Sequence, residues 1–253
     1  MNRLGEVNHE AAPALYRRAA PILHGLLTGA CRRDWDDFPS LPQTGPAIVV
    51  ANHLSSFDAV LVADYVMYHG RFPYFLAKAS LWHVPLLGRF VRGIDQIPVV
   101  RGTHQASEAL VEARHKLEDG KVVFIFPEGT TARDTRMWPF AVKTGAARLA
   151  IQTGVPVVPV GHWGSSTICP DNNGPQRLPH PWPRPWVHFR SGEPIDMSAF
   201  GQDPTDRDAV RAACTAMLEA IVVLVGQARG EVPPAERWNP RTNSYVPPDQ
   251  AAW

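Results

Sequence analysis

Short apolar runs alternate with longer segments of helical periodicity from residue 47 onward. The runs are three to five residues long and rich in β-branched side chains, which is typical of buried strands. The runs that we interpret as strands are 47–51, 74–77, 97–100, 122–126, 157–160 and 187–189. Helical patterns lie between them near 58–69, 84–93, 103–118 and 141–153, and a mostly apolar one over 206–228 follows the last run.

This alternation predicts the α/β fold class, with a largely parallel central sheet flanked by helices. The chain has 253 residues, which is long for one average domain, but single α/β domains often reach this size. We therefore expect one domain. Pro98 and Pro159 fall within predicted strands, and because proline has no backbone N–H, they indicate edge strands or irregular pairing.

The segment from Ala11 to about Cys31 predicts an N-terminal amphipathic helix. Its apolar residues at helical spacing are Leu15, Ile22, Leu23, Leu26 and Leu27, and its cations are Arg17, Arg18, Arg32 and Arg33. Such a helix can lie in a membrane interface with its cations on lipid phosphates. The same pattern is found in helices that pack on the core of soluble proteins, so both interpretations stay open.

Proline is frequent, at 25 residues, and clusters between Pro170 and Pro185 and after Glu231. We expect neither cluster to form regular structure. The first cluster holds Trp182 and Arg184, which suits either a loop near lipid or a packed surface loop. The second is expected to be an extended or partly disordered tail.

Charge and cysteine content exclude several classes of protein. Lys and Arg number 25 against 24 Asp and Glu, so no global charge favours nucleic acid. The three cysteines form no C-x-x-C pair, which argues against a zinc knuckle or a disulfide framework. The N-terminus lacks a secretory signal, and no uninterrupted apolar run approaches the roughly 18 residues needed to span a bilayer. We expect a cytoplasmic chain that does not span the membrane.

Ionisable residues follow five of the predicted strands. They are His53, Lys78, Arg101, Glu128 and His162. In open α/β sheets ligands bind just beyond the carboxyl ends of the strands, so these side chains are expected to line one rim. Their convergence indicates a binding or catalytic site there.

Two interpretations fit the pair His53 and Asp58. Ser55-x-x-Asp58 is like a capping box, with Asp58 as a carboxylate that favours the helix dipole. Alternatively, one nitrogen of His53 donates to Asp58 while the other accepts a proton from an alcohol, which makes the imidazole a general base. The two roles of Asp58 are not exclusive, because a carboxylate has two oxygens.

The stretch from Phe126 to Thr131 reads as a strand end followed by a turn. It lacks the repeated glycine and terminal lysine of a phosphate loop. Glu128 is either an exposed charge or an acceptor for substrate hydroxyls, with Gly129 giving backbone access. Cations suited to a phosphate surround the rim: Arg101, Arg133 and Lys143.

Four blocks of the chain resemble the motifs of the glycerophospholipid acyltransferases, of which the lysophosphatidic acid (1-acylglycerol-3-phosphate) acyltransferases are the most familiar members. They are residues 52–58 with His53 and Asp58 in H-x-x-x-x-D spacing, 93–101 as a Gly-led strand ending in Arg101, 126–130 as Phe-Pro-Glu-Gly-Thr, and 155–160 as an apolar Pro-containing strand. A lone H-x-x-x-x-D is a weak signal. All four blocks in order, over about residues 47–165, are a strong one.

The resemblance implies transfer of a fatty acyl group from acyl-CoA or acyl carrier protein to a hydroxyl of a lysophospholipid, most simply 1-acylglycerol-3-phosphate. His53 and Asp58 would then be catalytic. The residues expected to bind substrate are Lys78, Arg101, Glu128, Gly129, Thr130, Arg133 and Lys143. No metal or cofactor beyond the acyl donor is implied, and the absence of a G-x-S-x-G elbow fits direct transfer. Many relatives place Arg directly after the third block, whereas this chain has Thr131 and Ala132 before Arg133.

In this interpretation the chain divides into an N-terminal amphipathic helix at 1–40, which is a candidate membrane-interface anchor, an acyltransferase domain at 41–230 and a Pro-rich tail at 231–253. The protein would lie peripherally on the inner face of the cell membrane. Three alternatives remain: a relative with another lyso-lipid or alcohol acceptor, a metal-dependent hydrolase, and a non-catalytic lipid-binding protein. The hydrolase is disfavoured because H-E-x-x-H is absent.

Overall fold

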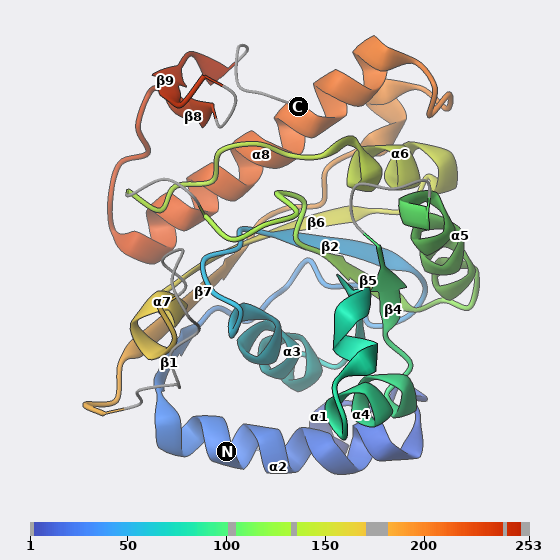
Figure 1. Cartoon of the computed structure of the whole chain (residues 1–253), viewed down its shortest axis with the longest axis vertical. Helices are drawn as coiled ribbons and strands as arrows, with labels where there is room; N and C mark the ends of the chain where they lie inside the picture. Colours follow the sequence, from blue (N-terminus) through green and yellow to red (C-terminus); the bar gives the residue numbers. More distant parts are fainter. Residues whose placement is uncertain (1–2, 101–104, 133–135, 171–181, 240–241, 249–253) are drawn as a thin grey trace.

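The fold was analysed in a computed structural model that describes residues 3–100, 105–132, 136–170, 182–239 and 242–248. Its centre is a seven-stranded sheet in the order β1-β7-β6-β2-β5-β3-β4 (Figure 1). The strands are β1 (Arg32–Trp35), β2 (Ala47–Ala51), β3 (Pro73–Lys78), β4 (Ile97–Val99), β5 (Val122–Ile125), β6 (Val157–Trp163) and β7 (Trp186–Ser191). The five neighbouring strands β6, β2, β5, β3 and β4 are parallel. Strand β7 runs antiparallel to β6, and β1 runs parallel to β7.

Helices cover both faces of this sheet. Figure 1 shows α8 (Arg207–Arg229) and α6 (Thr144–Thr153) above it, with α5 (Gln105–Glu118) alongside. On the other face α3 (Asp58–Tyr68) packs beneath the sheet, and α2 (Ala14–Ala30) lies under α3. The remaining helices are short: α1 (Leu4–Val7), η1 (Ala79–His83), α4 (Leu87–Gly93), α7 (Ser165–Ile168) and η2 (Met197–Phe200). The predicted α/β domain with a mostly parallel sheet is confirmed.

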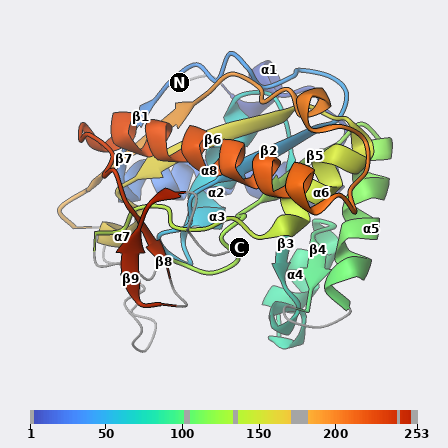
Figure 2. The ribbon, with the colours of Figure 1, turned by 90° about the horizontal axis from the view of Figure 1, so that it is seen from above.

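Burial on both faces explains why the central strands carry continuous apolar runs. Every residue of β2 and β5 is buried, because α8 packs above them and α3 below, as Figure 2 shows from above for α8. Pro98 lies in β4, the edge strand, as predicted. Pro159 lies inside the sheet, and its carbonyl accepts from Gly192 N (2.9 Å) just past the end of β7. The Gly192 carbonyl, which a backbone N–H at position 159 would otherwise bond, accepts from the Ser40 hydroxyl (2.6 Å).

Two elements differ from the sequence prediction. Arg32 and Arg33 do not end the helix but begin β1, which forms because Arg33 pairs with Val187 of β7. The tail is also more regular than expected, since β8 (Arg237–Asn239) and β9 (Ser244–Val246) form an antiparallel hairpin. Its buried Arg237 is held by Glu219 of α8 at 2.7 Å, which fixes the hairpin to the domain.

The N-terminal helix α2 presents two different faces. Tyr16, His24 and Leu27 are buried against the body of the domain, whereas Ile22 and Leu26 are 65% and 68% exposed. Core packing is therefore confirmed for one face, and the other leaves large apolar side chains uncovered. Among the described residues α8 is the one helix long and apolar enough to cross a membrane, yet more than half of its apolar window is buried, as in a core helix.

Candidate active site

His53 and Asp58 lie in contact at the carboxyl end of β2. The chain leaves the sheet after Ala51, turns through residues 52–57 and enters α3 at Asp58. His53 Nδ1 donates to Asp58 Oδ2 at 2.9 Å, and the same oxygen accepts from the backbone amides of Leu54 (2.5 Å) and Ser55 (2.8 Å). Asp58 is fully buried and the His53 side chain is 12% exposed. The carboxylate therefore orients the imidazole and holds the turn at once.

The capping box that was one interpretation of this stretch is only half formed, because Asp58 Oδ2 accepts from the Ser55 amide but the Ser55 hydroxyl does not accept from the Asp58 amide. Asp58 is the first residue of α3 and not the third, and its carboxylate turns back over the loop. The Ser55 hydroxyl instead accepts from Phe57 N (3.1 Å) and donates to the carbonyl of Cys169 (2.6 Å), beyond α7. The loop is thus fixed both by local contacts to the Asp58 carboxylate and by a contact to a distant part of the chain.

The imidazole of His53 is held with one nitrogen available. Its ring stacks on Phe126 with centroids 4.2 Å apart. Its backbone N donates to Glu128 Oε1 (2.9 Å), and its carbonyl accepts from Ala132 N (2.7 Å). With Nδ1 donating to Asp58, the neutral tautomer leaves a lone pair on Nε2, which has no partner among the described residues. That nitrogen can accept a proton from a bound hydroxyl.

His162 lies next to this pair, near the end of β6. The sequence indicated that His162 follows the apolar run 157–160 but assigned it no function. It is fully buried, and its Nε2 donates to the carbonyl of Asn52 at 2.8 Å and lies 3.7 Å from Asp58 Oδ2. The Asn52 side chain donates to the His162 carbonyl (3.0 Å) and accepts from its amide (2.9 Å). Three hydrogen bonds thus join the ends of β2 and β6.

Electrostatics keep Asp58 ionised and His162 neutral. Burial alone would raise the pKa of Asp58, but the His162 and His53 imidazoles and the Ser165 hydroxyl outweigh it, so the pKa lies below its usual range. Burial lowers the pKa of His162 despite the nearby Asp58 carboxylate. An ionised Asp58 can balance the positive charge that the His53 imidazole gains when it accepts a proton as a general base.

Glu128 lies beneath the loop, with its carboxyl group buried. It accepts hydrogen bonds from the backbone amides of His53 and Phe140, and burial raises its pKa to about 8 in spite of them. Its other oxygen has no partner among the described residues. The structure therefore shows Glu128 supporting the backbone of His53, and its predicted contact with a substrate hydroxyl stays a prediction.

The remaining predicted residues lie along the same rim where the structure describes them. Lys78 ends β3 with an exposed side chain. Gly129 has a φ of +68°, and a Cβ there would come within 2.8 Å of the Lys143 side chain, so a larger residue would displace that lysine. Thr130 is half-buried beside it. Arg101 and Arg133 lie outside the described residues.

No group of three or more His, Cys, Asp or Glu side chains could hold a metal ion within the part of the chain that the structure describes. The chemistry of the rim is that of one oriented imidazole, one buried carboxylate and nearby lysines. This is a site suited to proton transfer from a hydroxyl next to an anionic group.

The comparison with known proteins gives the family to which this fold and site belong. The chain belongs to the Acyltransferase family, whose sequence model matches residues 37–163. The match covers β2, the dyad, Glu128 and all of β6.

Several proteins of known name are similar to this chain. A chloroplastic 1-acyl-sn-glycerol-3-phosphate acyltransferase of Brassica napus is 30% identical over 55% of the chain and 39% of its own length. The 1-acyl-sn-glycerol-3-phosphate acyltransferase of Salmonella typhimurium is 28% identical over 81% of this chain and 76% of its own. The crystal structure of the 1-acyl-sn-glycerophosphate acyltransferase of Thermotoga maritima superposes with a TM-score of 0.56 and 26% identity, covering 85% of this chain and 78% of that one. The chain spans 39% and 34% of the length of the two chloroplastic relatives, from Brassica napus and Arabidopsis thaliana.

Proposed function

We propose that the protein is a 1-acylglycerol-3-phosphate O-acyltransferase, which moves a fatty acyl group from acyl-CoA or acyl carrier protein to the free hydroxyl of 1-acylglycerol-3-phosphate. The observation that carries the proposal is the His53 imidazole, which is oriented by a buried carboxylate and whose Nε2 has no partner in the part of the chain that the structure describes. It lies in the segment that matches the Acyltransferase family. The names of the similar proteins support the choice of acceptor.

In the proposed reaction His53 acts as general base. Its Nε2 takes the proton of the acceptor hydroxyl as the oxygen attacks the thioester carbonyl carbon, so a C–O bond forms. The tetrahedral intermediate then expels the thiolate, the C–S bond breaks, and the imidazolium returns the proton to sulfur. Asp58 stabilises the imidazolium between these steps, and general-base catalysis of this kind is worth about 10²–10⁴-fold in rate.

The acceptor phosphate is proposed to lie among the cations of the rim. Lys78 and Lys143 come from separate elements, and Lys143 lies against Gly129 at the turn after β5. Arg101 and Arg133 complete the proposed set, with Thr130 and the backbone of Gly129 beside the glycerol and Glu128 near its hydroxyl.

The protein is further proposed to act at the cytoplasmic surface of the cell membrane, where a lysophospholipid is available. Exposed apolar side chains support this: Ile22 and Leu26 of α2, Leu86 and Phe90 at α4, and Trp186 of β7. An added Cβ at Gly93 of α4 would meet Leu15 of α2, so the two helices touch. The residues at 1–40 are then proposed to act as a peripheral anchor.

One experiment tests the proposal. The purified protein is incubated with acyl-CoA or acyl carrier protein and a panel of lysophospholipids and other alcohols, and products are identified by mass spectrometry. We expect phosphatidic acid as the main product. A main product from another acceptor would reassign the substrate and leave the enzyme class intact. Lipid binding with no acyl product from any acceptor would contradict the enzyme and favour a binding protein.

A further inference from the structure

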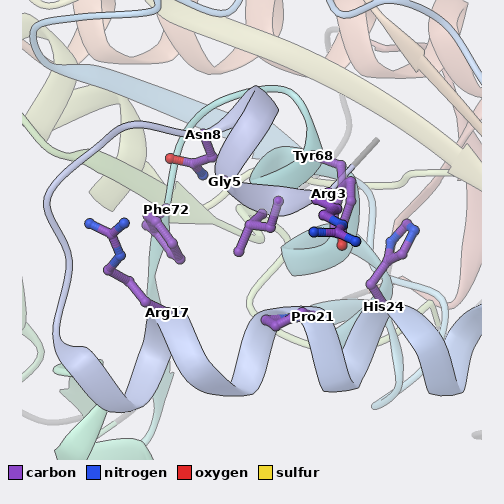
Figure 3. A pocket seen from close by; sticks show the side chains of 9 residues that line it. Arg3, Gly5, Asn8, Arg17, Pro21, His24, Tyr68 and Phe72 are labelled. Atoms are coloured by element: carbon purple, nitrogen blue, oxygen red, sulfur yellow. The ribbon is translucent and has the colours of Figure 1, made fainter. Parts of the chain in front are cut away.

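A hollow of about 470 Å³ lies between α1, α2 and the junction of α3 with β3. Figure 3 shows it with α2 below and α1 above. The residues that line it are Arg3, Leu4, Gly5, Asn8, Arg17, Pro21, His24, Tyr68 and Phe72. Its volume falls in the range of roughly 300–1,000 Å³ that is usual for small-molecule sites.

This hollow is separate from the His53 site. Asp58 begins α3 at the carboxyl end of the strands, whereas Tyr68 ends the same helix. Eleven residues of helix at about 1.5 Å each put roughly 15 Å between the two ends. Phe72 immediately precedes β3, so the hollow lies at the amino ends of the strands.

The walls of the hollow combine apolar surface with positive charge. Phe72 and Leu4 are buried and form its apolar part together with Tyr68 and Pro21. Arg17, Pro21 and His24 are spaced four and three residues apart, so one face of α2 forms a wall. Figure 3 shows Arg17 beside Phe72 at one end, and Arg3 near Tyr68 and His24 at the other.

Neither lining guanidinium has an ion-pair partner among the residues that the structure describes. Both arginines are exposed, their guanidinium groups have no partner among the described residues, and no carboxylate lines the hollow. The nearby acidic side chains are engaged elsewhere, since Glu6 accepts from the backbone N of Arg3 and Glu10 pairs with Arg71.

The histidine adds no charge to this wall. His24 stacks on Tyr68 with centroids 3.5 Å apart, and its Nδ1 donates to the buried Asp64 at 2.8 Å. Burial lowers the pKa of His24, so it contributes a neutral, flat surface. The charge of Asp64 is met by Arg33 at 2.7 Å and is not available to Arg3 or Arg17.

We infer that this hollow is a second binding site, for an anionic single-chain amphiphile such as a fatty acid or an alkyl phosphate. The chain would lie on Phe72, Leu4 and Tyr68, and the anionic head would bind Arg17, which lies beside Phe72 (Figure 3) and whose planar fork suits both carboxylate and phosphate. The inference does not depend on the proposed acyl transfer, because none of the lining residues belongs to the His53 site.

Two pairs of variants isolate the site. Gly5 lines the hollow and a Cβ added there would contact nothing within 4 Å, so Gly5→Phe fills the space without strain in α1. Gly25 of α2 has the same freedom but does not line the hollow, which makes Gly25→Phe the matched control. Arg17→Gln removes one charge, and Arg18→Gln, on the next residue of α2, is its control.

Binding is measured by titration calorimetry with laurate and with dodecyl phosphate below their micelle concentrations. We expect Gly5→Phe and Arg17→Gln to weaken binding of at least one probe about tenfold or more, and both controls to bind as the wild type does. His53→Ala should also bind as the wild type does, which separates this site from the catalytic one. Dodecanol, which lacks the anionic head, tests the apolar contacts alone, and inorganic phosphate, which lacks the alkyl chain, tests the charge contact alone.

Three results would overturn the inference. Equal binding by all four variants would place the amphiphile elsewhere on the protein. No binding by the wild type at millimolar probe would show an empty hollow. Binding of inorganic phosphate as tight as that of dodecyl phosphate would indicate a simple anion site, because the apolar floor would then contribute nothing.

Discussion

At the level of single residues, the site contains two buried carboxyl groups in opposite protonation states. Asp58 has a lowered pKa and receives three N–H donors, so it is ionised at neutral pH. Glu128 is buried with fewer donors, and its pKa is raised to about 8, so its neutral form predominates at pH 7. The first orients and stabilises a charged His53, while the second supports its backbone without adding a second negative charge.

The raised pKa of Glu128 makes stability depend on pH. A raised folded-state pKa means that the native state holds the proton more tightly, so this stabilisation is complete below about pH 4.5 and is lost as pH rises to about 8. Glu128→Gln cannot titrate. We expect the difference in Tm between this variant and the wild type, measured by differential scanning fluorimetry, to shift by several degrees in favour of the variant between pH 5 and pH 8. A constant Tm difference over this range would show that Glu128 is ionised in the folded protein.

The sequence could predict only part of this chemistry. His53 and Asp58 are five residues apart, so their contact is local and its spacing can be recognised. The clamp between Asn52 and His162 joins residues 110 apart, and it depends on β2 and β6 being neighbours in the sheet. The burial of Glu128 depends on how residues 126–132 pack against His53, which no local pattern records.

At the element scale, the loop between β2 and α3 is held from three sides. Glu128 holds it from the end of β5, His162 from β6, and the Cys169 carbonyl from beyond α7 through Ser55. This arrangement makes the dyad a property of several elements, since each contributes one contact that fixes where the imidazole points.

Removing the Asn52 side chain tests this arrangement. Asn52→Ala leaves the buried amide and carbonyl of His162 without partners, which costs about 1–3 kcal/mol. We expect Tm to fall by several degrees, and kcat to fall at least tenfold while KM changes little. Thr215→Ala, which removes a hydroxyl bonded to Arg211 O on the exposed part of α8, is the control and should change neither. Unchanged kcat in Asn52→Ala would mean that the clamp does not position His53.

The sequence predicted the strands that have a clear apolar pattern. It did not predict the strands that form because a neighbouring strand is available to pair with them. The apolar runs of β2, β5 and β6 lie where the sequence indicated. The strand β1 is polar, with the sequence Arg-Arg-Asp-Trp, and exists because β7 offers it an edge. The β8–β9 hairpin likewise depends on contacts such as the packing of Trp238 on Tyr245 and the ion pair of Arg237 with α8.

At the scale of the whole molecule, the sheet separates two regions of different chemistry. The rim that holds His53 and Asp58 lies at the carboxyl ends of the parallel strands, and the hollow beside α1 lies at their amino ends. The outer face of α2 carries exposed apolar side chains near arginines, as a helix at a lipid surface does. Packing on the core accounts for the apolar residues on the inner face of this helix only. We propose that the apolar residues on its outer face bind the membrane surface.

Vesicle binding tests the outer face of α2. Replacing both Ile22 and Leu26 by Ser removes apolar contact while leaving the buried face intact. We expect binding to sedimented vesicles that contain anionic phospholipid to fall about tenfold or more. Val223→Ser, at a half-exposed apolar residue of α8, is the control and should bind like the wild type. Equal binding by the double variant and the wild type would exclude α2 as the anchor.

The central claim is that His53, oriented by Asp58, is the base that activates the acceptor hydroxyl. The most direct measurement is kcat/KM for acylation of 1-acylglycerol-3-phosphate by the wild type, His53→Ala and Asp58→Asn, with His115→Ala on the exposed surface of α5 as control. We predict a fall of about 10²–10⁴-fold for both dyad variants, with the control unchanged. His53→Ala turning over within tenfold of the wild type would contradict the account.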